Sequence, residues 1–309
     1  MRKLIMRCAL AIAATIGWQG TPGYAASIFA GPPADPVFGI VAPELVTAMF
    51  PNQRLELTSV PSGEAALDRV MADAASLAVT DLATMLDYAR RKTLGADRLQ
   101  FQSVAGRRCL LGFTQRGGWL RSFADLATAG AGPPPVIGVA DAEAEATLTL
   151  LRRFDPGLTA TVPVIAPLAD IIARAAKGTV DLALVMVYPE FDAAQIERLA
   201  DDPRLTRIPV VTRLLSRAGA ERASGFVLVP VRTDSGLLPW SRAPDITLCA
   251  PIGAVTRDDA PPLLRETIGR AAPVVAGILR TSVSDRAMKI AQSALDDFMG
   301  VVKDLLGRF

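Results

Sequence analysis

The sequence predicts an α/β protein of two lobes, each with a mainly parallel sheet flanked by helices. Two observations predict this fold. Strand-like and helix-like segments alternate through residues 27–91, and the same alternation begins again after residue 136. Alternation at this spacing is typical of parallel strands joined by helices. The 309 residues, of which 50% are hydrophobic, are enough to build a sizeable core.

The first β/α unit follows a short leader. Its strands are apolar or alternate apolar with polar residues, and its helices carry apolar residues on one face. Ser62 and Asp81 stand where helix N-caps are expected. The predicted order is strand, helix, strand, helix, strand, helix, at residues 27–31, 37–50, 54–60, 62–74, 76–80 and 81–91.

The second unit comes after two apolar runs between residues 99 and 114, which are split by Gly106, Arg107 and Arg108. A short helix is expected at 122–129, and Gly178 stands at a predicted helix end. The strands and helices of this unit are expected at 136–140, 142–154, 161–165, 168–177 and 180–187. The later segments are expected to be helix and loop at 213–224, strands at 226–231 and 245–256, and helices at 258–280 and 284–306.

This order places one lobe within the other along the chain. Residues 27–114 and 224–309 would form the first lobe, and residues 115–223 the second. The chain would cross between the lobes twice, near residues 109–115 and again in the later strands. Two crossings of this kind allow the lobes to close over a ligand.

Residues 1–26 are typical of a secretory signal: a basic start, a short apolar run and small residues at the end. The alternative is an uncleaved membrane anchor, although the apolar run is short for a span. We therefore expect an exported, periplasmic protein. Without Arg2, Lys3 and Arg7 the formal charge falls from +2 to −1. A nearly neutral protein lacks the basic surface that nucleic-acid binding needs.

The composition argues against an enzyme. Histidine is absent, which removes Ser-His-Asp, Cys-His and His-metal sites. No phosphate-binding lysine loop and no Gly-x-Ser-x-Gly motif occurs. We expect no catalytic residue, no cofactor and no metal. Cys109 and Cys249 remain after the leader, and they either form a disulfide or stay as two buried thiols.

Several segments resemble the TAXI branch of the type II periplasmic solute-binding proteins, which serve TRAP transporters. The resemblance rests on the order of individually weak motifs along nearly the whole mature chain. These are Val60 to Leu67, Ala72 to Asp81, Leu120 to Leu126, Lys177 to Ala183 and Asp245 to Thr256. It implies a type II periplasmic-binding-protein fold, a small-molecule ligand held between the lobes and a membrane permease as partner.

Two segments depart from the family pattern. The turn after the first strand, which begins at Gly31, is rich in proline and has lost amide donors. The second-lobe turn that should hold an anion is acidic, with Asp141, Glu143 and Glu145. These carboxylates would occupy or repel the anion position at a helix N-terminus. They could instead pair with a cationic or amine-bearing ligand, or simply stabilise their own helix.

The candidate ligand-binding residues lie at the predicted edge between the lobes. Each has a structural alternative: helix capping for Ser62 and Asp81, and partial burial at a strand end for Tyr188. Arg107, Arg108 and Arg116 could hold a carboxylate, but we interpret them as solvated charges at a sheet edge. The candidates are Gly31, Ser62, Gly63, Thr80, Asp81, Asp141, Glu143 and Tyr188.

We therefore expect a monomeric solute-binding protein that captures a small molecule and delivers it to a TRAP-type permease. The alternative is a protein of the same fold whose pocket has degenerated, acting as a periplasmic partner or sensor-input subunit. The prolines after Gly31 and the acidic turn at 141–145 motivate that alternative.

Overall fold

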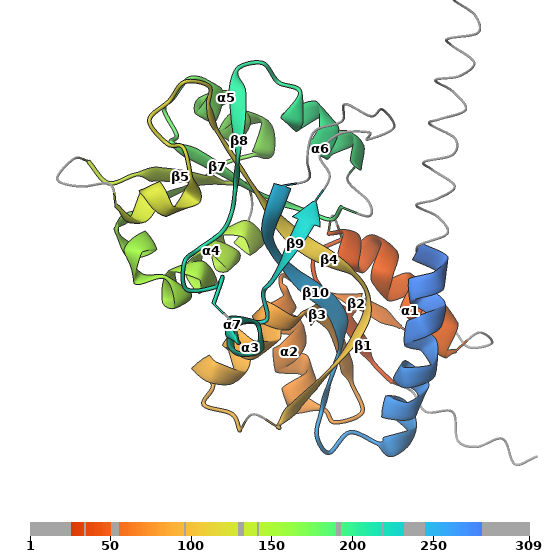
Figure 1. Ribbon diagram of the computed structural model, residues 1–309. Helices are drawn as coiled ribbons and strands as arrows, with labels where there is room; N and C mark the ends of the chain where they lie inside the picture. Colours follow the sequence, from red (N-terminus) through yellow and green to blue (C-terminus); the bar gives the residue numbers. More distant parts are fainter. Residues whose placement is uncertain are drawn as a thin grey trace, which may run out of the picture.

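The computed structural model describes residues 26–279, apart from 34, 51–55, 96, 129–132, 141, 190–192, 218 and 232–244. Ten described strands form one hydrogen-bonded sheet in the order β2-β1-β3-β10-β4-β7-β5-β6, with β8 beside β4 and β9 (Val227–Val231) beside β10. Helices cover both ends of this sheet (Figure 1). The predicted α/β fold class, with two lobes and two crossings between them, is confirmed. The predicted leader, except Ala26, and the helix at 284–306 lie outside the described residues.

The first lobe is a parallel three-stranded sheet with helices on both faces. Strand β1 lies between β2 and β3 and is parallel to both. Because side chains alternate along β3, Val79 packs with α1 and the last described helix, while Ala78 packs with α2 and α3. The elements are β1 (Ile28–Ala30), the π-helical turn η1 (Val37–Val41), α1 (Ala42–Met49), β2 (Leu57–Ser59), α2 (Gly63–Ala72), β3 (Leu77–Asp81), α3 (Leu82–Arg91) and a helix over 262–279.

The second lobe repeats this plan. Strand β5 lies between β6 and β7 and is parallel to both. Gly178, with a φ of 72°, follows the end of α5 as predicted. Helix α6 and strand β8 were not predicted. The elements are η2 (Phe123–Ala127), β5 (Val136–Val139), α4 (Ala142–Phe154), η3 (Pro156–Ala160), β6 (Val162–Ile165), α5 (Leu168–Ala176), β7 (Leu182–Val187), α6 (Ala193–Ala200) and β8 (Leu205–Pro209). The short helix α7 (Ala220–Ser224) follows and lies beside α3 of the first lobe.

Two long antiparallel strands, β4 (Leu99–Gln115) and β10 (Asp245–Arg257), run from one lobe into the other. Strand β10 pairs with β3 of the first lobe, and β4 pairs with β7 of the second. The break expected at residues 106–108 is wrong, because β4 is continuous there. Pairing with β10 carries the strand through this point with a bulge in β4, where residues 104–106 stand opposite Ile252 alone and Gly106 has a φ of 76°.

A disulfide joins the two crossing strands near their middle. Cys109 and Cys249 are directly opposite in register, their Cα atoms lie 4.0 Å apart, and their sulfurs are bonded. Both residues are buried in the second-lobe core. The disulfide therefore fixes β4 to β10 immediately beside Arg108. In the described part of the chain, none of the helices is long and apolar enough to cross a bilayer.

Candidate functional site

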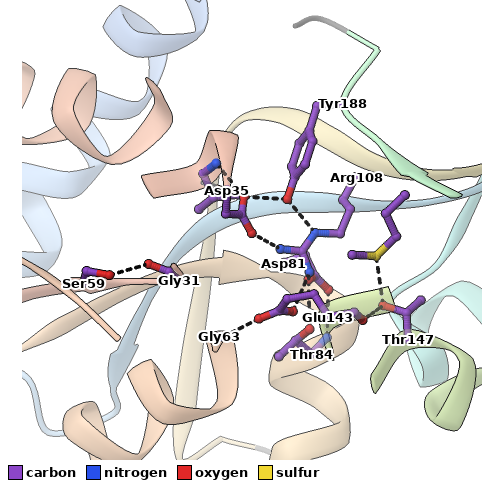
Figure 2. Close-up of polar contacts among 12 residues, drawn as sticks. Gly31, Asp35, Ser59, Gly63, Asp81, Thr84, Arg108, Glu143, Thr147 and Tyr188 are labelled. Atoms are coloured by element: carbon purple, nitrogen blue, oxygen red, sulfur yellow. Dashed lines mark hydrogen bonds and ion pairs between the residues drawn. The ribbon is translucent and has the colours of Figure 1, made fainter. Parts of the chain in front are cut away.

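Five polar side chains meet where the lobes and the crossing strands come together (Figure 2). Arg108 of β4 lies at their centre, and its exposed fraction is 6%. We call these residues the Arg108 cluster: Asp35, Asp81, Arg108, Glu143 and Tyr188.

The guanidinium of Arg108 donates to every other member of the cluster. Its Nη1 lies 2.9 Å from Asp81 Oδ2 and 3.2 Å from Glu143 Oε2. Its Nη2 lies 3.1 Å from Asp35 Oδ2, and its Nε lies 3.0 Å from the Tyr188 hydroxyl oxygen. Most of the five N–H donors of Arg108 are thus used within the protein.

Local structure holds each acid in place. Asp81 ends β3 and caps α3, with Oδ1 accepting from the Thr84 amide at 2.8 Å. Asp35 precedes η1, and its Oδ1 accepts from the Val37 amide at 2.8 Å and from the Tyr188 hydroxyl at 2.7 Å. Each of these two carboxylates therefore has a backbone partner in addition to Arg108.

Glu143 reaches from the first turn of α4 to the other lobe. Its Oε1 accepts from the Gly63 amide, 3.0 Å away in the first turn of α2. A Cβ on Gly63 would lie 2.4 Å from Thr80 Oγ1, so the helix can approach β3 this closely only with glycine. Helix N-termini attract anions. Glu143 thus occupies the place where the carboxylate of an anionic ligand would be expected.

Burial and charge set the protonation of the cluster. Burial by itself lowers the pKa of Arg108, but the neighbouring carboxylates outweigh burial and hold this pKa well above its ordinary value. Burial raises the pKa of the Tyr188 phenol, while Arg108 opposes that increase. Arg108 is therefore charged and Tyr188 neutral near pH 7.

A cavity of about 250 Å³ adjoins the cluster, between α2 and α3 of the first lobe and α4 of the second. Both crossing strands and β7 contribute to its walls. The wall includes an apolar part near the Arg108 cluster. The lining residues are Ser62, Glu64, Asp81, Ala83, Thr84, Asp87, Arg91, Arg108, Leu110, Glu143, Glu145, Ala146, Thr147, Thr149, Leu150, Arg153, Met186, Phe226 and Ala250.

A second group of charges lies around the cavity, and we call it the rim network: Glu64, Asp87, Arg91 and Arg153. Arg91 pairs with Glu64 at 2.7 Å and with Asp87 at 2.8 Å. Arg153 of α4 also pairs with Asp87, so this network joins the two lobes. The hydrogen bonds of Arg91 to Glu64 and Asp87, together with the negative charges of these two carboxylates, raise the pKa of Arg91.

The structure brings together several of the predicted residues. Asp81, Glu143 and Tyr188 belong to the Arg108 cluster, and Gly63 donates to Glu143. Ser62 caps α2, with its hydroxyl accepting from the Ala65 amide, and it also lines the cavity.

Other predicted residues lie apart from the cavity. The carbonyl of Gly31 accepts from the Ser59 hydroxyl, and Gly31 does not line the cavity. Thr80 is buried behind Gly63, and its hydroxyl makes no hydrogen bond within the described chain. Asp141 lies outside the described residues.

Two members of the cluster were missed by the sequence reasoning. Asp35 was treated only as part of a proline-rich turn. Arg108 was interpreted as a solvated charge, and this interpretation is wrong because β4 is an interior strand between β10 and β7. One signal was available: Arg108 directly precedes the apolar run that starts at Cys109, where an exposed charge is unusual.

No protein-family model and no curated protein matches the sequence. The BvgS VFT2 domain of Bordetella pertussis is similar, with a TM-score of 0.46 and 13% identity over 84% of this chain and 93% of that one. A TctC solute-binding protein from Polaromonas gives 0.43 and 13%, over 85% and 87%. The regulatory domain of MetR, a LysR-family regulator from N. meningitidis, gives 0.46 and 12%, over 81% and 94%. Likeness at this level assigns no function.

Proposed function

We propose that this protein is an exported solute-binding protein that captures a small molecule between its lobes and delivers it to a TRAP-type membrane permease. The observation that carries the proposal is the cavity of about 250 Å³, whose walls come from both lobes and both crossing strands. Ligand sites of α/β proteins lie beyond the carboxyl ends of the strands, where Asp81 is found here.

The contacts between the lobes suggest how capture would occur. Glu143 with Gly63, Tyr188 with Asp35, and Arg153 with Asp87 each join residues of different lobes. These contacts must separate if the lobes open, while β4 and β10 remain as the connection. A ligand that bridges the lobes would add to the contacts of the closed state and shift the population toward it.

The proposal includes the expectations that concern the whole chain. Residues 1–26 would direct export to the periplasm and be removed. The lobes would comprise residues 27–114 with 224–309, and residues 115–223. The ligand-binding residues would be the predicted residues that line the cavity, Ser62, Asp81 and Glu143, with Gly63 and Tyr188 supporting them.

One observation favours a second function, that of a periplasmic partner or sensor-input protein without transport. Glu143 and its neighbours already satisfy Arg108 and the α2 N-terminus, so the part of the site that would take an anion is filled by the protein. Under this alternative the closed form needs no ligand.

Thermal unfolding of the mature protein with organic acids, amino acids and amines tests solute capture. At least one compound should raise the Tm and bind in calorimetry. The variant Ala146→Trp, at an exposed position that lines the cavity, should abolish binding. Ala72→Trp is the matched control, exposed on α2 away from the cavity.

A pull-down from membranes distinguishes the two functions. Recovery of a permease supports delivery to a transporter, whereas recovery of a sensor kinase supports the alternative. Binding of no compound, or binding that Ala146→Trp leaves unchanged, would contradict capture in this cavity.

A further inference from the structure

The cavity carries an excess of negative charge. Five carboxylates and three guanidinium groups line it, which gives a net charge of −2. Each guanidinium is already paired: Arg91 with Glu64 and Asp87, Arg153 with Asp87, and Arg108 within its cluster. An anionic solute would therefore have to displace a carboxylate of the protein and would meet the remaining ones.

One carboxylate of the lining lies outside every close ion pair of the described residues. Glu145 lies on α4, two residues after Glu143, and is half-buried. Among the described residues its carboxylate makes no hydrogen bond and no close ion pair, and its negative charge acts on Arg152 of the same helix, where it opposes the lowering of the Arg152 pKa by burial. The Glu143 oxygen that contacts Arg108, Oε2, also retains acceptor capacity, since a carboxylate oxygen has about two lone-pair sites, whereas Asp81 Oδ2 already accepts from both Arg108 and the Thr84 hydroxyl.

Beside the charged groups and the hydroxyls of Ser62, Thr84, Thr147 and Thr149, the cavity has an apolar wall. Leu110, Leu150, Met186, Phe226 and Ala250 come from three strands, a helix and the segment before β9. A strongly hydrated metal ion would gain nothing from such a wall, whereas a hydrocarbon body would be removed from water by it. The volume of about 250 Å³ is below the ~300–1,000 Å³ of pockets for drug-sized ligands, which favours a small molecule.

We propose that the solute is a small organic cation, with one ammonium group near Glu145 and an apolar body against Leu110, Met186 and Phe226. This inference rests on the proposed function and names its substrate class. Glu143 would have two roles in this site. It fills the anion position at Gly63, which excludes acids, and it contributes negative charge to the cavity.

Calorimetry on the mature protein, with primary alkylamines from ethylamine to hexylamine and the matching alcohols and carboxylates, tests the inference. At least one amine should bind at least tenfold more tightly than its alcohol, equivalent to ~1.4 kcal/mol, and no carboxylate should bind. Glu145→Gln should weaken the amine about tenfold with little change in Tm, because the side chain keeps its volume. Glu266→Gln, at an exposed position on the 262–279 helix, is the matched control and should bind as the parent does.

The outcomes separate the two proposals. If a carboxylate or an alcohol binds as well as the amine, the inference that the solute is a cation is wrong, and the proposal of solute capture stands. If calcium chloride raises the Tm and the amines do not, the site prefers a metal and the inference fails. If no amine binds, the inference also fails, and the broader screen then decides on solute capture separately.

Discussion

The Arg108 cluster and the rim network both pair arginine with aspartate and glutamate and both join the lobes, but their arginines differ in burial. The side chains of Arg108 and Asp81 are 6% and 3% exposed, whereas those of Arg91 and Glu64 are 32% and 42% exposed. Exposed ion pairs contribute ~0–1 kcal/mol because water and salt screen them. A buried pair is costly to break, because the partner that remains is a charge without compensation.

This difference teaches that the number of ion pairs does not indicate their energetic weight. The cluster places three carboxylates around one guanidinium, away from water. The second oxygen of each carboxylate accepts a hydrogen bond from a backbone amide. In the rim network Arg91, Arg153 and Glu64 face water and can exchange their partners for it, while Asp87, at 11% exposed, is as buried as Glu143. Substitutions in the cluster should therefore affect stability strongly, and substitutions in the rim should affect it weakly.

Replacing the central cation should have the largest effect. Arg108→Met would leave Asp35, Asp81 and Glu143 buried without a cation, and we expect a loss of ~3–5 kcal/mol in the free energy of unfolding. Urea denaturation would measure it. Arg108→Lys keeps the charge but not the planar fork, so it should recover only part of the loss. If Arg108→Met lost no more free energy of unfolding than a substitution of an exposed arginine, the buried position of Arg108 would be contradicted.

The next largest effect is expected at Tyr188. Tyr188→Phe removes the hydroxyl that donates to Asp35 and accepts from Arg108, while it keeps the ring. Hydrogen bonds to charged groups contribute ~1.5–3 kcal/mol, and the loss should fall in that range. Tyr88→Phe is a matched control, because that hydroxyl donates to the half-exposed Asp68. An equal loss in both variants would show that the interlobe position of Tyr188 has no special weight.

Truncating Glu143 should create a binding site for a small carboxylate at the Gly63 amide. Glu143→Ala leaves the Gly63 amide and an Arg108 N–H without this acceptor, at a cost of ~1–3 kcal/mol. Acetate should then raise the Tm of this variant and leave that of the parent unchanged. Glu145→Ala, on the same helix but without a contact to Gly63, should not respond. An acetate effect of equal size in all three proteins would be a general salt effect and would argue against the vacated site.

The smallest effect is expected in the rim network. Arg91→Gln removes the pairs with Glu64 and Asp87, yet we expect a loss of less than ~1 kcal/mol. Thermal unfolding at low and high salt would measure it, and the difference from the parent should shrink as salt increases. A loss as large as that of Arg108→Met would show that the rim, rather than the cluster, holds the lobes together.

Local signals in the sequence predicted much of the fold. The β/α alternation located the parallel strands of both lobes, and Ser62 and Asp81 cap α2 and α3 as expected. The continuity of β4 was not predictable from its own residues. Gly106 and two arginines look like a turn, and the pairing of Arg107 and Arg108 with β10 keeps this segment in a strand.

The candidate site was predicted only in part, because its members come from separate elements. Asp81, Glu143 and Tyr188 were found because they end strands or begin helices, which are local properties. Asp35 and Arg108 were missed because what they do depends on contacts with residues 27 to 153 positions away. A contact across such a separation leaves no periodic pattern along the chain.

The sequence by itself determined the order of the parallel strands and their helices, the caps of α2 and α3, and the absence of histidine, since these follow from the composition and from neighbours within a few residues. Only the tertiary structure decided that Arg108 is buried, that Glu143 takes the anion position at Gly63, and that Cys109 meets Cys249. The physical reason is that a buried charge is tolerated only where compensating charges converge on it, and the packing of two lobes on two crossing strands sets that convergence.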